Sequence, residues 1–265
     1  MFRDRIRSEG TGRGLVCLHG LGGSGKVWEP LRSDLARDHQ VVCLDLPGHG
    51  GTPLRQPRVD LEDLADATAA AVDRLDLPDP VLVGHSLGGY IAALAVRRHP
   101  ACARALVLID QTFRLEAPLP PAALAAVARD PEPVLRVMLG SRAASPAQGR
   151  ARVAEALAVG PEVLLGYLAS LGRGEGAELA AGLTVPVLVC VRQAPEPGSR
   201  AFRAWMAAQG LDRIPRVAVA VFAGAGHWIM LDRPRSLAGA IRELEARLAS
   251  APRPGPPRGG SPRRW

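Results

Sequence analysis

The chain has 265 residues, enough for one large α/β domain or two small ones, and its 47% hydrophobic content is ample for a sizeable core. The net charge is +7 at pH 7, but four of the arginines lie in the acid-free segment 251–265, and the rest of the chain carries only +3. Nucleic acid binding needs a concentrated basic face, so this modest excess argues against a nucleic acid partner.

Short apolar runs alternate with helical stretches up to residue 111. Runs typical of buried parallel strands occur at 15–18, 41–44, 81–83 and 105–109, and a further short strand is expected at 2–7. Helices are expected at 27–37, at 60–75 and from 90 onward. Alternation of this kind predicts an α/β fold: a mostly parallel sheet, joined by right-handed crossovers, with helices on both faces.

The alternation stops between residues 112 and 182, where only helical pieces are expected. They are rich in alanine and leucine, and they lie at about 121–129, 131–139, 146–158 and 161–171. Strands resume at 186–191 and 217–222, with helices at 199–209 and 234–248. We therefore expect a core made of 1–111 and 183–250, with a helical cap, 112–182, inserted between two late strands. A small helical domain with no role in the site is the alternative interpretation of the insertion.

Composition and local sequence features predict the cellular compartment and the partners of the protein. Segment 251–265, rich in proline, arginine and glycine, cannot bury a core and is expected to be disordered. No signal peptide is apparent after the charged N-terminus, and no apolar stretch approaches the length of about 20 residues that spans a bilayer. The four cysteines are Cys17, Cys43, Cys102 and Cys190; three of them lie inside apolar strand-like runs and are expected to be buried and reduced, without metal spacing between them. We expect a cytoplasmic protein without a metal or membrane partner; its oligomeric state is open.

A serine flanked by glycines marks the stretch that is most informative about chemistry, Gly84-His85-Ser86-Leu87-Gly88-Gly89. An apolar run leads into it, and a helix-forming stretch that begins at Tyr90 leads out. Glycine two residues before and two after the serine is the pattern of a nucleophile elbow, whose tight strand-to-helix turn needs small neighbours. The turn holds the serine Oγ at the positive end of a helix. A glycine-rich turn with an incidental serine, or a degenerate dinucleotide-binding loop, is the simpler alternative.

A serine hydroxyl is a weak nucleophile and needs a base. His227 is the best candidate among the six histidines, because it lies in a small-residue loop straight after the last expected strand, downstream of the elbow. Of the other five, we interpret His19, His49 and His85 as structural or turn residues. We interpret His39 and His99 as surface residues.

Two backbone N–H groups must face the oxyanion that develops on a substrate carbonyl. One is expected from Leu87, directly after the nucleophile, and the other from Leu21 in the glycine-rich turn His19-Gly20-Leu21-Gly22. A phosphate cradle is the competing interpretation of residues 20–25. The spacing of a P-loop is absent, however, because Lys26 is followed by Val27 and not by serine or threonine.

Four motifs in this order resemble the α/β-hydrolase fold superfamily, and within it the cap-bearing esterase and peroxidase-like branch. The motifs are His19-Gly20-Leu21-Gly22-Gly23-Ser24, Asp45-Leu46-Pro47-Gly48-His49-Gly50, the elbow, and Gly226-His227. The resemblance covers about residues 14–248. It implies a mostly parallel sheet with helices on both sides, a Ser–His–acid triad and no cofactor, with the first antiparallel strands of the family shortened or missing.

The acid of the triad is the point at which this sequence departs from the family. In most members an aspartate follows the strand that matches 187–191, but here Pro195 takes its place and Glu196 comes one residue late. Asp110, which ends the strand 105–109, is the preferred candidate, because the ends of parallel strands converge on one crevice. Glu196 is the runner-up, and an incomplete triad with weak catalysis is the third possibility.

The sequence therefore predicts a serine hydrolase that cleaves a carboxylic ester, thioester or lactone of a small molecule through an acyl-enzyme on Ser86. A non-hydrolytic biosynthetic enzyme of the same fold, such as a lyase, cyclase or isomerase, is the alternative, and a ligand-binding scaffold is a third hypothesis. Five aromatic side chains are candidates for the substrate pocket, although core packing explains each one alone equally well: Trp28, Tyr90, Phe113, Tyr167 and Trp228.

Overall fold

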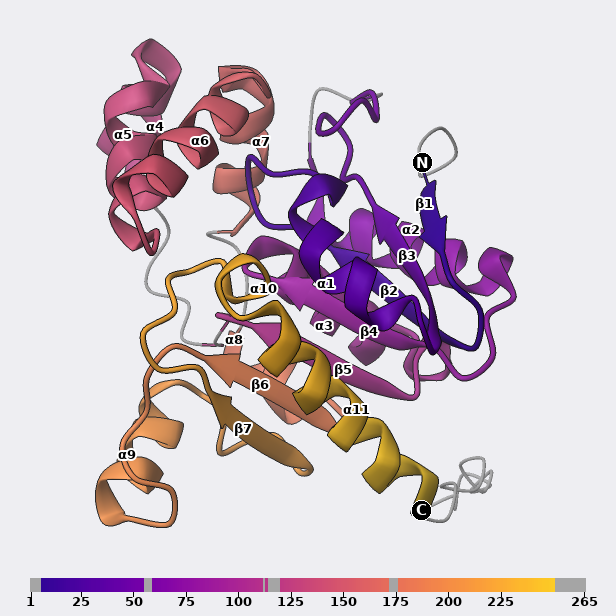
Figure 1. Ribbon diagram of the computed structural model, residues 1–265. Coiled ribbons are helices and arrows are strands. Elements are labelled where there is room, and N and C mark those ends of the chain that lie inside the picture. Colours follow the sequence, from indigo (N-terminus) through magenta and orange to yellow (C-terminus); the bar gives the residue numbers. More distant parts are fainter. Residues whose placement is uncertain (1–5, 55–58, 112, 114–119, 172–175, 251–265) are drawn as a thin grey trace, which may run out of the picture.

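The computed structural model describes residues 6–54, 59–111, 113, 120–171 and 176–250 (Figure 1). Within them, seven strands form one sheet in the order β1-β3-β2-β4-β5-β6-β7. β1 runs antiparallel to β3, and the other neighbouring strands pair in parallel. The strands are β1 Ile6–Glu9, β2 Arg13–Leu18, β3 His39–Leu44, β4 Val81–His85, β5 Ala105–Ile109, β6 Val187–Val191 and β7 Val217–Val221. The expected mostly parallel α/β sheet is confirmed.

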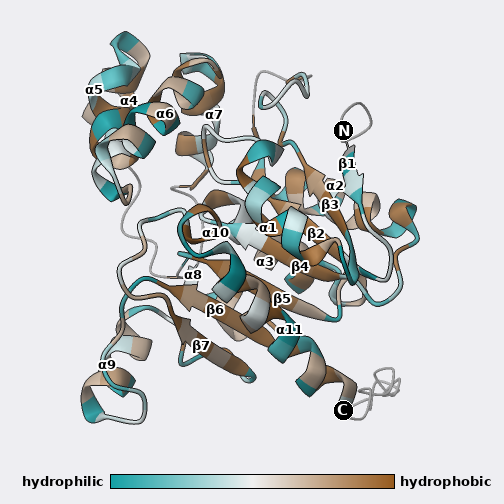
Figure 2. Ribbon diagram, in the orientation of Figure 1, coloured by the Kyte–Doolittle hydropathy of each residue, from teal (hydrophilic) through white to brown (hydrophobic). Residues whose placement is uncertain are grey.

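The central strands are buried on both faces of the sheet. Successive side chains of a strand point to opposite faces, and in β4 Leu82 belongs to one apolar cluster whereas Val81 and Val83 belong to the other. Figure 2 shows the strands β4, β5 and β6 as predominantly hydrophobic along their length. Burial on both faces explains why these strands are near-continuous runs of valine and leucine in the sequence.

Helices cover both faces. On the face of Leu82 lie α2 (Leu61–Leu75), α3 (Leu87–Arg98) and α9 (Arg200–Ala208), and on the opposite face lie α1 (Glu29–Leu35) and α11 (Pro234–Ser250). The remaining short elements are the helix α10 (Ile229–Asp232) and three 3-10 helices at Gly25–Trp28, Pro100–Cys102 and Gly140–Arg142.

Five helices, which we call the inserted helices, lie between β5 and β6: α4 Pro121–Arg129, α5 Pro131–Met138, α6 Pro146–Leu157, α7 Pro161–Leu171 and α8 Gly176–Ala181. The first four begin with proline, whose fixed φ and missing N–H suit the first helical position. Figure 1 shows α4 to α7 gathered beyond one end of the sheet. They press on the loop that follows β2, since a Cβ on Gly22 would lie 2.4 Å from the Cβ of Ala156 in α6.

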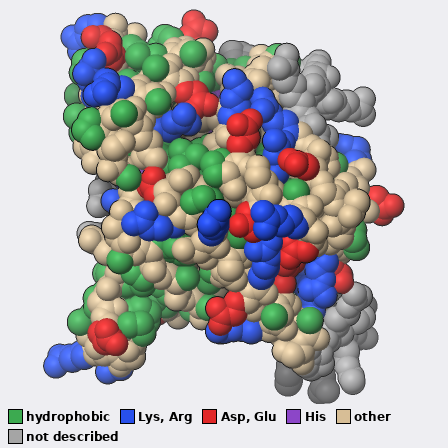
Figure 3. Space-filling model, viewed as in Figure 1, with side chains coloured by type: hydrophobic (Ala, Val, Ile, Leu, Met, Phe, Trp, Pro, Cys, Tyr) green, Lys and Arg blue, Asp and Glu red, His purple; other side chains and the backbone are tan. Residues whose placement is uncertain are grey.

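The surface carries charges of both signs. On the face seen in Figure 3, Lys and Arg side chains are interspersed with Asp and Glu. The large hydrophobic side chains found exposed in the described residues are Val137 and Val221. No single helix of the described chain combines the length and the apolarity needed to cross a membrane; α6 and α7 pass by length and composition only as a pair, which is bent by 99°.

Several expected boundaries need correction. The described part of the N-terminal strand, Ile6–Glu9, extends two residues past the expected end at 7; residues 1–5 lie outside the described part, as does the tail 251–265. The helix expected at 27–37 is a 3-10 turn followed by the shorter α1. α8 and α10 have no counterpart among the expected elements, because helices of six and four residues are too short to show a helical period. All four cysteines are buried and free, which confirms the expectation for the three in apolar runs.

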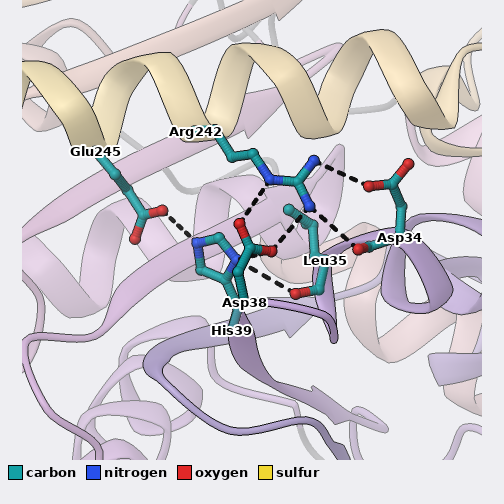
Figure 4. A network of polar contacts seen from close by, with 6 residues as sticks. All are labelled: Asp34, Leu35, Asp38, His39, Arg242 and Glu245. Atoms are coloured by element: carbon teal, nitrogen blue, oxygen red, sulfur yellow. Dashed lines mark hydrogen bonds and ion pairs between the residues drawn. The ribbon is translucent and has the colours of Figure 1, made fainter.

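A polar network joins α11 to the segment that ends α1 and begins β3 (Figure 4). Arg242 of α11 donates to the carboxylates of Asp34 at 2.9 Å and Asp38 at 2.8 Å. His39 contacts Asp38 through Nδ1 and the buried carboxylate of Glu245 through Nε2. The expectation that His39 lies at the surface is wrong: its side chain turns toward α11, and only 3% of the residue is exposed.

Candidate active site

Ser86 stands between the end of β4 and the start of α3 with a φ of 49° and a ψ of −121°. A residue with a side chain is strained there, and such strain persists only where the surrounding structure imposes it. The N–H of Ser86 donates to the carbonyl of Ile109 in β5 at 3.1 Å, and its own carbonyl accepts from the N–H groups of Gly89 and Tyr90. The strand-to-helix turn expected around this serine is therefore present.

Glycines allow the neighbouring elements to approach this turn. A Cβ on Gly84 would lie 2.4 Å from the Cα of Gly89, and a Cβ on Gly88 would lie 2.4 Å from the carbonyl oxygens of both Leu18 and His19. Backbone atoms cannot move aside as the end of a flexible side chain can. The glycines of the motif are thus required for close packing of α3 against β4 and the end of β2.

His227 and Asp110 meet at the carboxyl ends of the strands. Asp110 follows β5, and His227 lies in the loop after β7 with 2% of its surface exposed. The Nδ1–H of His227 donates to Oδ2 of Asp110 at 2.5 Å, and the backbone N–H of His227 donates to the carbonyl of Arg142 at 2.7 Å. The Oγ of Ser86 has no hydrogen-bond partner among the described residues. Hydrogen bonds between catalytic groups are often long in structures without a bound substrate.

Two arginines flank the carboxylate of Asp110. The Nε of Arg192 lies 3.0 Å from Oδ2, and the Nη2 of Arg142 lies 3.5 Å from the same oxygen. Burial opposes the charged form of Asp110, but the hydrogen bond from His227 and the two guanidinium charges outweigh it and lower its pKa. Burial lowers the pKa of His227; Asp110 opposes this effect, and both arginines add to it. At neutral pH the pair is a carboxylate and an uncharged imidazole.

The glycine-rich turn after β2 is held by two buried histidines. The Nε2 of His49 accepts from the N–H of Gly22 at 3.1 Å, and the Nε2 of His19 accepts from the N–H of Leu46 at 3.0 Å. His19 also donates its Nδ1–H to the carbonyl of Gly20. Burial lowers the pKa of His19 to about 4 and that of His49 to about 3, so both rings are neutral at physiological pH and keep these tautomers.

The backbone N–H groups of Leu21 and Leu87 have no acceptor among the described residues. Leu87 is the first residue of α3, where an N–H has no intrahelical partner. Leu21 follows Gly20, and a Cβ on Gly20 would lie 3.2 Å from the Cβ of Ser86, so this turn packs directly against the serine. Both donors are free to bind an oxygen of a ligand.

The alternative acid, Glu196, is not brought to this place. It is exposed, and within the described part of the chain its side chain makes no hydrogen bond or ion pair with His227. The same part of the chain holds no group of three or more His, Cys, Asp or Glu side chains that could bind a metal ion.

The five aromatic candidates for the substrate pocket are all buried, at 0 to 5% exposure. Trp228 packs against the ring of His227, with centroids 5.0 Å apart. Tyr167 packs on the ring of His49, and its hydroxyl donates to a backbone carbonyl at 2.9 Å. The other three contribute to the two apolar clusters of the core: Trp28, Tyr90 and Phe113. A shared lining by all five stays a prediction.

Three polar residues around His227 are not predicted from the sequence: Arg142, Arg192 and Asp232. The carboxylate of Asp232 accepts from the N–H of Gly226 and from the side-chain amide of Gln148 in α6, both at 2.7 Å. Arg192 follows β6 directly, and the convergence of strand ends is a signal that could have indicated it. No local pattern marks Arg142, because the packing of the inserted helices on the core is a tertiary property.

A mostly parallel sheet with helices on both faces and a serine in a strained strand-to-helix turn define an α/β hydrolase. The sequence model of the alpha/beta hydrolase family matches residues 15–240. The chain belongs to the alpha/beta hydrolase family.

Curated relatives match a smaller part of the chain. A putative non-heme haloperoxidase of Mycobacterium phage D29 is 36% identical over 110 residues, which are 41% of this chain and 40% of that protein. A pimeloyl-[acyl-carrier protein] methyl ester esterase of Neisseria meningitidis is 41% identical over 100 residues, 38% of this chain and 30% of that protein. The matches thus span less than half the length of these relatives.

Solved structures match nearly the whole chain. A thermophilic esterase from Thermogutta terrifontis superposes with a TM-score of 0.73 and 23% identity over 92% of this chain and 93% of that one. An esterase from Exiguobacterium antarcticum superposes with a TM-score of 0.76 and 16% identity over 90% of this chain and 94% of that one. At these identities the likeness establishes the fold alone.

Proposed function

We propose that the protein is a serine hydrolase that cleaves a small-molecule carboxylic ester, thioester or lactone through an acyl-enzyme on Ser86. The observation that supports this most strongly is the 2.5 Å hydrogen bond from His227 to Asp110, at the same end of the sheet as Ser86, which directly follows β4. In the proposal His227 is the general base and Asp110 orients it. An esterase among the relatives is consistent with this chemistry.

In the first half-reaction, the Oγ of Ser86 attacks the carbonyl carbon of the substrate while the Nε2 of His227 takes its proton. Asp110 holds the Nδ1–H tautomer that leaves Nε2 free for this task and stabilises the imidazolium that forms. The oxyanion accepts hydrogen bonds from the N–H groups of Leu21 and Leu87. The bond from the carbonyl carbon to the leaving group then breaks, and the leaving group receives the proton from His227.

In the second half-reaction, water replaces the leaving group. His227 takes a proton from the water as its oxygen attacks the acyl carbonyl of the Ser86 ester. The collapse of the second tetrahedral species returns the proton to the Oγ of Ser86 and releases the carboxylic acid. Asp110 remains a carboxylate throughout, in line with its lowered pKa.

The inserted helices are proposed to be the cap that selects the substrate. Their contacts favour this role, because they touch both loops that carry proposed site residues. Gly22, next to Leu21, packs on Ala156 of α6, and a Cβ on Gly226 would lie 2.4 Å from the backbone nitrogen of Ala144. A substrate bound at Ser86 would then be enclosed between the strand ends and these helices.

The test is the hydrolysis of aryl esters and acyl thioesters of increasing acyl length by the wild type, Ser86→Ala and Ser33→Ala. The loss of the nucleophile should lower kcat by about 10⁴-fold or more. Ser33 is an exposed residue of α1 whose hydroxyl donates to a backbone carbonyl, so its variant should keep wild-type activity. Full activity in Ser86→Ala would contradict the mechanism. A folded wild type that is inert toward every ester and thioester would favour the non-hydrolytic alternative.

A further inference from the structure

Two arginine side chains contact the carboxylate of Asp110 in addition to His227. Its Oδ2 accepts from His227 at 2.5 Å and lies 3.0 Å from the Nε of Arg192 and 3.5 Å from the Nη2 of Arg142. The Nε of Arg192 is also 3.2 Å from Oδ1, so this group touches both oxygens. Hydrogen bonds between a guanidinium and a carboxylate are among the strong ones in proteins and fix the plane of the carboxylate.

The end of β6 holds Asp110 through both its backbone and a side chain. The carbonyl of Cys190 accepts from the N–H of Asp110 at 2.8 Å, and two residues later Arg192 reaches the carboxylate. Asp110 has a φ of 45°, a value that few residues other than glycine, asparagine and aspartate adopt. Arg192 adds a side-chain contact to the backbone hydrogen bond from this residue.

Arg142 holds both members of the pair. Its carbonyl accepts from the backbone N–H of His227 at 2.7 Å, while its guanidinium approaches Asp110. The contact is close because Gly226 has no side chain, and a Cβ there would lie 2.9 Å from the Arg142 carbonyl oxygen. Arg142 ends a 3-10 helix among the inserted helices, so this contact ties that segment to the loop of His227.

We propose that Arg192 and Arg142 are positioning residues of the Asp110–His227 pair, which fix the carboxylate and supply positive charge that disfavours protonation of the imidazole. In its kinetic consequences the inference rests on the proposed hydrolase function. The arginines touch no reacting atom, and they act through Asp110 and His227.

Two other titratable side chains lie near His227. The ring of His85 in β4 is 4.5 Å from that of His227, and its Nε2–H donates to the His227 carbonyl at 3.0 Å. Burial lowers the pKa of His85 so far that this ring stays neutral. Asp232 is engaged with the N–H of Gly226 on the backbone side of the loop. The charges that act on the imidazole are therefore those of Asp110 and the two arginines, beside burial itself.

The first test is the pH dependence of kcat/KM for ester hydrolysis in Arg192→Met, Arg192→Lys and Arg142→Met. Arg192→Met should lower kcat about 10-fold or more. It should also shift the acid limb of the kcat/KM profile to higher pH by about 0.5 to 1 pH unit. Arg192→Lys keeps the charge but not the planar fork, so the acid limb should stay near that of the wild type while kcat falls. Arg142→Met should show a smaller shift, because its contact is longer.

Arg200→Met is the matched control, since it removes one positive charge from an exposed position at the start of α9. Its kcat and acid limb should equal those of the wild type. An equal fall of kcat/KM at every pH in Arg192→Met, without a shifted limb, would indicate a merely structural role and overturn the proposal.

The second test needs no turnover. The imidazole of His227 can be titrated by NMR in the folded protein without substrate, its signal being identified by its loss in His227→Gln. Arg192→Met should raise the pKa of His227, and Arg200→Met should leave it unchanged. An unchanged pKa in Arg192→Met overturns the inference even if the protein is a hydrolase. A raised pKa in a protein that hydrolyses no ester supports the inference and rejects the proposed function alone.

Discussion

Ser86 and Asp110 follow neighbouring parallel strands, and both have a positive φ, 49° and 45°. The N–H of Ser86 donates to the carbonyl of Ile109, and the N–H of Asp110 donates to that of Cys190. The hydrogen-bonded ladder of β4, β5 and β6 therefore continues to both residues. It brings them to one edge of the sheet, where the loop after β7 supplies His227.

This arrangement predicts which carboxylate orients the histidine. Asp110→Asn should lower kcat by about 10³- to 10⁴-fold, because an amide can no longer hold the Nδ1–H tautomer of His227. Glu196→Gln should leave kcat within about two-fold of the wild type, since Glu196 is exposed and away from the histidine. Steady-state kinetics on one aryl ester compares the two variants. A larger loss in Glu196→Gln than in Asp110→Asn would reverse the assignment.

Much of this site could be predicted from sequence because its signals are local. Glycines around Ser86 mark a turn that only small residues can form, and short apolar runs mark strands that are buried on both faces. The preference for Asp110 over Glu196 rests on one topological rule, that the ends of parallel strands share an edge. The structure brings Asp110, and not Glu196, to His227.

The rest of the site depends on contacts between segments far apart in the sequence. Arg142 reaches the loop of His227 from the inserted helices, and no periodicity or spacing encodes that contact. The burial of His39 depends in the same way on Glu245, which lies 206 positions away. A polar side chain in a local pattern resembles a surface residue until its distant partner is known.

The close packing around Gly88 predicts that a side chain at this position destabilises the fold. Gly88→Ala would place a Cβ 2.4 Å from two carbonyl oxygens at the end of β2, and separating those backbones should destabilise the protein by about 2–4 kcal/mol. Gly239→Ala in α11 is the control, because a Cβ there meets nothing within 4 Å and alanine favours a helix by about 0.5–1 kcal/mol. Chemical denaturation measures both. Equal stability of the two variants would show that α3 can move away from β2.

The pH profile of the wild type tests the electrostatics of the base. Burial and the two arginines lower the pKa of His227 from its ordinary value of 6.5, against the effect of Asp110. As the proposed general base, His227 should therefore stay deprotonated at a lower pH than a free histidine, and kcat/KM should reach half of its plateau below pH 6.5. The measurement is kcat/KM on a substrate without ionisable groups. A half-maximal value above pH 6.5 would mean that Asp110 outweighs burial and the arginines.

The network in Figure 4 predicts a different pH dependence, that of stability. Burial opposes the charged form of His39, but the contacts with Glu245 and Asp38 outweigh it and raise its pKa above 6.5. The stabilisation is thus complete below pH 6.5 and is lost as the pH rises through the higher pKa of the folded state.

Denaturation midpoints of the wild type and of His39→Gln, measured from pH 6 to pH 9, test this dependence. The wild type should lose stability across that range, and the variant should lose less. Parallel curves for the two proteins would show that His39 does not contribute to the pH dependence of stability.

The proposed mechanism requires Ser86 to be an activated nucleophile, and covalent labelling tests this requirement without knowledge of the substrate. A fluorophosphonate should modify the wild type at one residue, which peptide mapping by mass spectrometry should locate at Ser86. Labelling should disappear in Ser86→Ala and slow by orders of magnitude in His227→Gln, because the hydroxyl then lacks its base. A folded wild type that stays unlabelled, or an adduct on a different serine, would show that Ser86 is not the activated nucleophile.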